Sequence, residues 1–122
     1  MMYVCLEVVR LLLSKSEIDI NKAMDDGWTA LIKASRKGHL EVVRLLLSKS
    51  EIDINKAKDN GCTALYIASE KGHLEVVRLL LSKSEIDINK GMPGWTPLKK
   101  AKQKGHTEIV KLLKEANECT IS

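Results

Sequence analysis

Three histidines, His39, His73 and His106, are the residues of this chain whose type and spacing could hold a metal ion. Each follows a glycine at the same point of a repeated stretch, and imidazole is a common zinc ligand at about 2.1 Å. Helices in contact lie about 8–10 Å apart, so equivalent side chains of successive repeats cannot reach one ion together. We therefore expect the histidines to be structural, and we expect no metal site.

Other kinds of chemistry have little support in the residues. Cys5, Cys62 and Cys119 form no CxxC motif and cannot all pair, which favours a reducing, cytoplasmic compartment. We find no Ser/His/Asp or Cys/His arrangement, no P-loop and no dinucleotide-binding glycine motif. The sequence therefore predicts that the protein is not an enzyme and uses no cofactor or small-molecule substrate. No apolar run approaches the ~20 residues of a membrane-spanning helix.

The elements that position these residues are repeated. The string LEVVRLLLSKSEIDINK occurs three times without change, at residues 6–22, 40–56 and 74–90, a spacing of 34 (40 − 6 and 74 − 40). Within one unit, Thr29 can cap a short helix that Gly38 ends, and a more apolar second helix follows before an extended loop. This period is typical of a solenoid whose units cover one another's apolar faces.

Three stretches share a family motif: GWTALIKASRKGHLEVVRLLLSKSEIDIN (27–55), GCTALYIASEKGHLEVVRLLLSKSEIDIN (61–89) and GWTPLKKAKQKGHTEIVKLL (94–113). They combine G-x-T-[AP]-L, an alanine, G-H and an aliphatic run ending in Leu-Leu, and in this they resemble the ankyrin repeat. The resemblance implies an all-α, ankyrin-type solenoid of stacked helix-turn-helix units joined by β-hairpin loops. Hairpin fingers and short inner helices would form its concave side, and it would be a scaffold that binds a partner protein.

The repeat predicts the boundaries of five segments. Residues 1–23 are a partial N-terminal repeat with only the second helix and loop, 24–57 and 58–91 are full repeats, 92–116 are a C-terminal capping repeat and 117–122 are a flexible tail. The cap has Thr107 and Lys114 where the inner units have Leu, which gives it a polar outer face. The incomplete first unit leaves three alternatives: a monomer with a frayed end, a fragment of a longer array, or an end covered by a second chain.

Positions that differ between units lie on the predicted fingers and inner helices, whereas the outer helix repeats without change. A surface that recognises a partner varies in this way, so we predict that a protein partner contacts it. The predicted contact residues are Asp25, Asp26, Trp28, Lys33, Arg36, Lys58, Asp59, Asn60, Tyr66, Glu70, Trp95, Lys99, Lys102 and Gln103.

Trp28, Cys62 and Trp95 share the place after the glycine of each finger. The two tryptophans are either exposed anchors for a partner or packed along their own hairpin against the neighbouring unit, and the sequence favours neither.

Charge gathers near the C-terminus, where residues 99–122 carry six basic and three acidic residues. The simpler interpretation is a solubilising cap. We do not expect nucleic acid as a partner, because the chain lacks interleaved aromatic residues and an arginine cluster.

The last four residues, Cys119 to Ser122, fit the C-a-a-X prenylation box and follow a group of lysines that could supply a second membrane signal. Two alternatives to the simple scaffold remain: a prenylated, membrane-attached ankyrin adaptor, and the ankyrin segment of a larger enzyme or effector. A membrane is expected as a partner only if Cys119 is prenylated.

Overall fold

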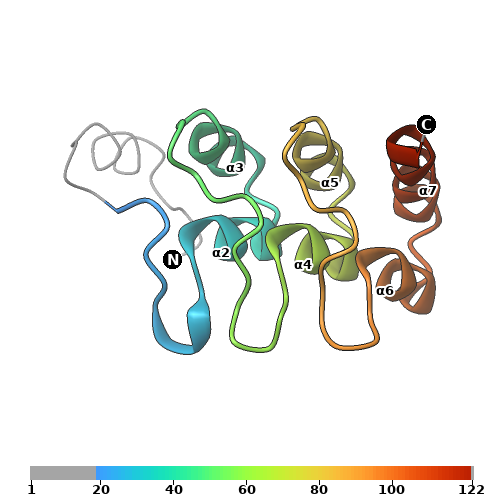
Figure 1. The fold of residues 1–122 in the computed structure, drawn as a ribbon, viewed down its shortest axis with the longest axis horizontal. Coiled ribbons are helices and arrows are strands. Elements are labelled where there is room, and N and C mark those ends of the chain that lie inside the picture. Colours follow the sequence, from blue (N-terminus) through green and yellow to red (C-terminus); the bar gives the residue numbers. More distant parts are fainter. Residues whose placement is uncertain (1–18, 122) are drawn as a thin grey trace.

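The computed structural model describes residues 19–121, which form a line of helical hairpins (Figure 1). A short 3-10 turn, η1 (Asp25–Gly27), precedes α2 (Ala30–Lys37) and α3 (Leu40–Leu47). The next unit contains α4 (Ala64–Lys71) and α5 (Leu74–Leu81), and the last contains α6 (Pro97–Lys104) and α7 (Thr107–Ile121). The helix predicted for the partial first repeat lies outside the described residues.

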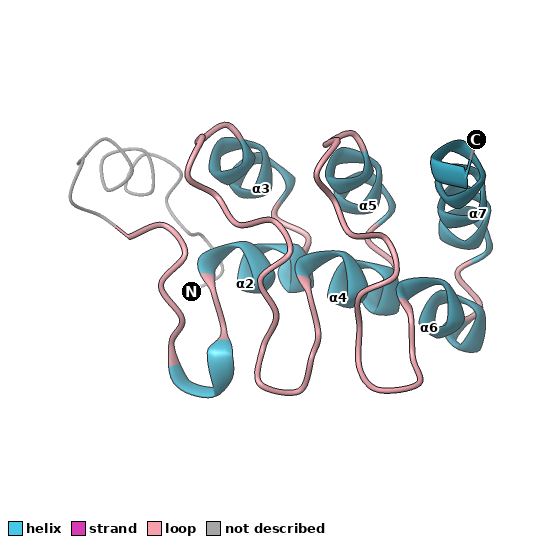
Figure 2. Ribbon diagram, viewed as in Figure 1, coloured by secondary structure: helices cyan, strands magenta, loops and turns pink. Residues whose placement is uncertain are grey.

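The helices form two rows (Figure 1). α2, α4 and α6 lie side by side in the inner row, and α3, α5 and α7 form the outer row. Each inner helix also contacts the outer helix of its own unit. A hairpin loop extends from the base of each inner helix, so the loops form a row of fingers (Figure 2). The all-α solenoid predicted from the repeat is confirmed.

Each inner helix begins and ends at the residues that the sequence indicates. The hydroxyls of Thr29, Thr63 and Thr96 each accept a hydrogen bond at 3.2 Å from the backbone N–H three residues later. Such N-caps satisfy one of the free donors of a helix start. At the other end, Gly38 and Gly72 adopt left-handed φ angles of 73° and 79°, which only glycine takes without cost.

The core lies between the two rows and between units. Leu46 and Leu80 of the outer helices are 2% and 0% exposed, whereas Arg44 and Arg78 point to solvent. Each arginine pairs with the glutamate three residues before it, at 3.5 and 3.6 Å. The outer helices therefore bury their leucines and turn their charged side chains to solvent.

The fingers are hairpins without regular strands. In the second finger, Gly61 N–H donates to the Lys58 carbonyl at 2.8 Å and Lys58 N–H donates to the Cys62 carbonyl at 2.9 Å. Gly61, with φ 95°, completes a three-residue hairpin turn. No strand occurs among residues 19–121, so the predicted β-hairpins keep their turn and lack a β-ladder.

Residues 117–121, predicted to lie in a flexible tail, are helical in the structure, and their flexibility stays a prediction. α7 continues without a break through Ile121. No glycine or proline follows Gly105, so nothing in the sequence ends this helix. The inner units end their outer helices after eight residues, whereas α7 has 15.

Candidate functional site

The three fingers (residues 24–28, 58–62 and 92–95) and the exposed residues of α2, α4 and α6 form one side of the solenoid, which we call the inner face. Contacts between α2 and α4 and between α4 and α6 hold the helices side by side. Asp59 N–H donates to the Asp26 carbonyl at 3.1 Å, which joins the first two fingers. The outer face consists of the exposed residues of α3, α5 and α7.

The structure brings most of the predicted contact residues together on the inner face. Eight of them are exposed, and four others are half-buried. The exposed ones are Asp26, Lys33, Arg36, Asp59, Asn60, Lys99, Lys102 and Gln103, and the half-buried ones are Trp28, Lys58, Glu70 and Trp95. The side chain of Asp25 lies outside the described part of the chain.

The prediction that Tyr66 contacts a partner is wrong, because the residue is only 1% exposed. Its ring fills the space over Gly91, where an added Cβ would lie 2.7 Å from Tyr66 Cδ2. Burial raises the pKa of Tyr66, with smaller contributions from Cys62 and Glu70. Among the described residues its hydroxyl has no hydrogen-bond partner.

A sequence signal for this packing exists. Tyr66 replaces Ile32 of the preceding unit, and Gly91 replaces Ala57 at the equivalent place one unit later. A larger side chain is thus matched by the loss of a methyl group opposite it. The difference between units at Tyr66 reflects core volume and not partner recognition.

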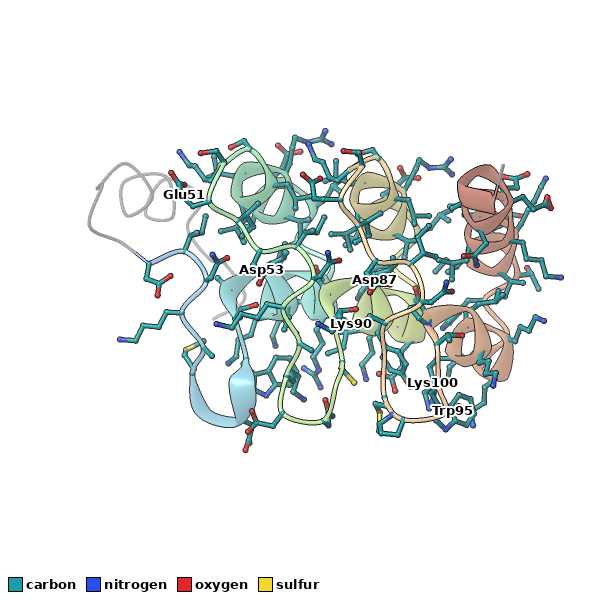
Figure 3. The ribbon with its side chains drawn as sticks, in the orientation of Figure 1. Glu51, Asp53, Asp87, Lys90, Trp95 and Lys100 are labelled. Atoms are coloured by element: carbon teal, nitrogen blue, oxygen red, sulfur yellow. The ribbon has the colours of Figure 1, made fainter. Side chains whose placement is uncertain are left out.

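Both tryptophans are half-buried and hold cations over their rings. Lys58 Nζ, from the second finger, lies 3.8 Å from the centroid of the Trp28 ring in the first. Lys33 Nζ and Arg36 Cζ each lie 5.9 Å from the same centroid. In the third unit, Lys100 Nζ lies 5.0 Å from the Trp95 ring (Figure 3). Trp28 therefore contacts the neighbouring unit, which is one of the two arrangements that the sequence allowed.

Two of the three histidines, His73 and His106, join units, which is a structural role. His73 Nε2 donates to the Arg36 carbonyl at 2.8 Å, and His106 Nε2 donates to the Glu70 carbonyl at 2.9 Å. Each ring lies against the terminal glycine of the preceding inner helix, since a Cβ on Gly38 would come within 2.7 Å of His73 Nδ1. A histidine engaged in this way connects one unit to the next.

Asparagines in the repeated loop make a second connection between units, which the sequence did not predict. Asn55 Nδ2 donates to the Glu85 carbonyl at 2.8 Å, and Asn55 Oδ1 accepts from Asp87 N–H at 2.7 Å. Asn21 makes the same pair of bonds to Glu51 and Asp53, which lie on the next loop along the stack (Figure 3). The asparagine recurs in every copy of the repeat, which was the available signal.

Residues 19–121 contain no group of three His, Cys, Asp or Glu side chains that could hold a metal ion. An apolar hollow of about 270 Å³ lies at the N-terminal end of the described stack, lined by residues that include Met24, Ala34 and Val42. None of the described helices is long and apolar enough to cross a membrane. The side chain of Cys119 lies outside the described residues, so its prenylation stays a prediction.

Comparison with known families agrees with the geometry. The family model for ankyrin repeats in three copies matches residues 1–92, and the model for a single ankyrin repeat matches residues 93–121. The chain belongs to the ankyrin repeat family. A search of curated proteins gives no match. Ankyrin repeats are generally protein–protein interaction modules and typically not enzymes, so the class of function agrees with the sequence prediction.

Proposed function

We propose that this ankyrin repeat protein is a non-enzymatic scaffold that binds a partner protein through its inner face. One observation carries the proposal: exposed residues vary between α2 and α4 on the inner face, whereas α3 and α5 on the outer face are identical. In the inner helices, exposed Lys33 and Arg36 correspond to Ile67 and Glu70 of the next unit.

Exposure alone does not account for this variation. On the outer face, the side chains of Glu41 and Arg44 are 64% and 57% exposed. The next unit nevertheless has the same residue types at these positions, Glu75 and Arg78. Between α2 and α4, the buried residues Leu31 and Ala34 repeat as Leu65 and Ala68, and one buried residue changes, Ile32 to Tyr66. Of the three differences between α2 and α4, the one at Tyr66 lies in the core and the other two lie at the exposed positions Lys33 and Arg36, which favours a recognition surface there.

We propose a cytoplasmic location on the basis of cysteine usage. Cys62 is an unpaired thiol, buried at the base of the second finger, and burial raises its pKa. A free buried thiol of this kind persists most readily in a reducing compartment.

The experiment first captures partner proteins by affinity. Uncharged residues of one face or the other are then replaced by tyrosine, and binding of the captured partner is measured again. Asn60→Tyr with Gln103→Tyr adds bulk to the inner face, and Ser48→Tyr with Ser82→Tyr adds the same bulk at the ends of the outer helices; all four positions are exposed. We expect the inner pair of substitutions to lower the affinity for a captured partner by about tenfold or more. The outer pair should leave this affinity unchanged. A partner that is lost only with the outer pair would refute the proposal.

A further inference from the structure

Charge is distributed very unevenly between the two rows of helices. α2, α4 and α6 carry eight basic residues against the single acidic residue Glu70; the basic ones are Lys33, Arg36, Lys37, Lys71, Lys99, Lys100, Lys102 and Lys104. α3, α5 and α7 carry four basic residues against five acidic ones. The inner row thus has a formal charge of +7 (8 − 1), and the outer row has −1 (4 − 5), although the whole chain has only +4.

The positive charge of the inner row is exposed and unpaired. All eight basic side chains except Lys100 are exposed, and Lys100 is half-buried. The two ion pairs among residues 19–121 are Glu41 with Arg44 and Glu75 with Arg78, and both lie on the outer face. No carboxylate in the described part of the chain therefore neutralises the inner row by an ion pair.

The cations around Trp28 concentrate this charge. Lys33, Arg36 and Lys58 come from α2 and from the next finger, and they lie within 5.9 Å of one ring centroid. The ring quadrupole attracts each of them, while the three cations repel one another. An anionic group beside them would relieve the repulsion. Trp95 with Lys100 repeats the arrangement more simply in the third unit.

The fingertips carry the opposite charge. Asp26 and Asp59 are exposed on the first two fingers, next to the basic helices. A nucleic acid carries negative charge along its whole backbone and would meet repulsion at these carboxylates. A polypeptide can place acidic residues over the helices and other residues at the fingertips, so its charges can complement both parts of the face.

We infer that the inner face binds an acidic, carboxylate-rich segment of a partner protein, which lies across α2, α4 and α6. The inference rests on the proposed function and narrows it to one class of partner. Packed helices lie about 8–10 Å apart, so α2 and α6 are separated by about 16–20 Å. An extended segment rises about 3.3 Å per residue, so about six residues span the three helices.

The test uses fluorescence anisotropy with a labelled peptide that contains about six glutamates spaced by Gly and Ser. A peptide with glutamine at the same places is the first control, and a single-stranded oligonucleotide of similar length is the second. We expect the glutamate peptide to bind at least about tenfold more tightly than the glutamine peptide, and its binding to weaken as salt is raised.

Two variants with equal net charge separate the inner face from a general charge effect. Lys33→Gln, Arg36→Gln and Lys102→Gln remove three charges from the inner face, and Arg44→Gln, Arg78→Gln and Lys114→Gln remove three from the outer face; all six positions are exposed. We expect the triple substitution on the inner face to lower the affinity for the glutamate peptide by about tenfold. The triple substitution on the outer face should have little effect on it.

Three results would overturn the inference: equal weakening by the two triples, no binding of the glutamate peptide, or tighter binding of the oligonucleotide than of the peptide. A partner that is displaced by Asn60→Tyr with Gln103→Tyr but keeps its affinity for the inner triple would also overturn it. In that last case the scaffold function would stand and only the acidic character of the partner would be wrong.

Discussion

At the scale of single residues, the asparagine of the repeated loop shows how identical residues come to have unequal roles. Asn55 holds the backbone of the next loop through both atoms of its amide. Asn89 has the same neighbours in sequence, yet its side chain has no hydrogen-bond partner among residues 19–121, since α7 continues as a helix where a further loop would otherwise follow. The contribution of this asparagine to stability therefore depends on the unit beside it.

Asn55→Ala and Asn89→Ala form a matched pair that tests this dependence. We expect Asn55→Ala to lower the free energy of unfolding by about 0.5–1.5 kcal/mol, because it removes two hydrogen bonds to the backbone of the next loop at a site that water can reach. Asn89→Ala should change it by less than about 0.5 kcal/mol. Urea unfolding of both variants measures the difference, and equal losses would mean that the loop contacts do not stabilise the stack.

Cys62 and Tyr66 predict how stability changes at alkaline pH. Burial raises the pKa of Cys62 above its ordinary value of 9.0 and that of Tyr66 above 10.0. Both groups hold their protons more tightly in the folded protein than in the unfolded one. Their contribution to the free energy of unfolding is therefore complete below about pH 9 and is lost as the pH rises through the folded pKa values. Urea unfolding between pH 7 and about pH 10, with a reductant present, should show falling stability. Cys62→Ala should flatten this fall, and stability that increases over the same range would contradict the assignment.

At the scale of elements, the ends of the inner helices could be predicted from sequence, whereas their contacts with the next unit could not. Thr29 and Gly38 act on backbone groups a few residues away, so local pattern suffices to locate them. The position of His73 over Gly38 depends on how two units stack. Tyr66 was misassigned for the same reason, because its burial is decided by Gly91, 25 residues later (91 − 66).

Gly72 and Gly105 separate the local role of the terminal glycine from its role in stacking. Both have left-handed φ angles, of 79° and 78°, so replacement by Ala should cost about 1–2 kcal/mol at either site. A Cβ on Gly72 would also lie 2.8 Å from His106 Cε1, whereas a Cβ on Gly105 would meet nothing within 4 Å. We expect Gly72→Ala to cost at least about 1 kcal/mol more than Gly105→Ala in urea unfolding. Equal costs would show that the histidine ring moves aside freely.

At the scale of the whole molecule, the order of the units could be predicted, because successive copies of the repeat pack against one another in the order of the chain. The end of the stack is harder to predict, since the tail at residue 117 was inferred from the end of the repeat pattern and no local signal stops α7. The charge contrast between the rows was also missed: counting along the chain located basic residues near the C-terminus, and only the arrangement in space gathers them with Lys33 and Arg36 on one face.

The stacked architecture also makes stability depend on neighbours, which removal of the last unit tests. α6 contacts α4 and α7 contacts α5, and Ala101, Ile109 and Leu113 are almost fully buried there. A chain that ends at residue 93 loses this cover, so apolar surface of α4 and α5 becomes exposed to water. We expect it to melt at a lower temperature and with less cooperativity than the full chain, as measured by circular dichroism.

A chain that ends at Glu118 is the matched control for this truncation, because it removes the last residues and keeps the buried side chains of α6 and α7. We expect its melting to stay close to that of the full chain. If the chain ending at residue 93 also kept the full melting temperature, the first units would be stable by themselves. The capping role of residues 92–116 would then be refuted, because a unit that covers its neighbour's apolar side chains must change that neighbour's stability when it is removed.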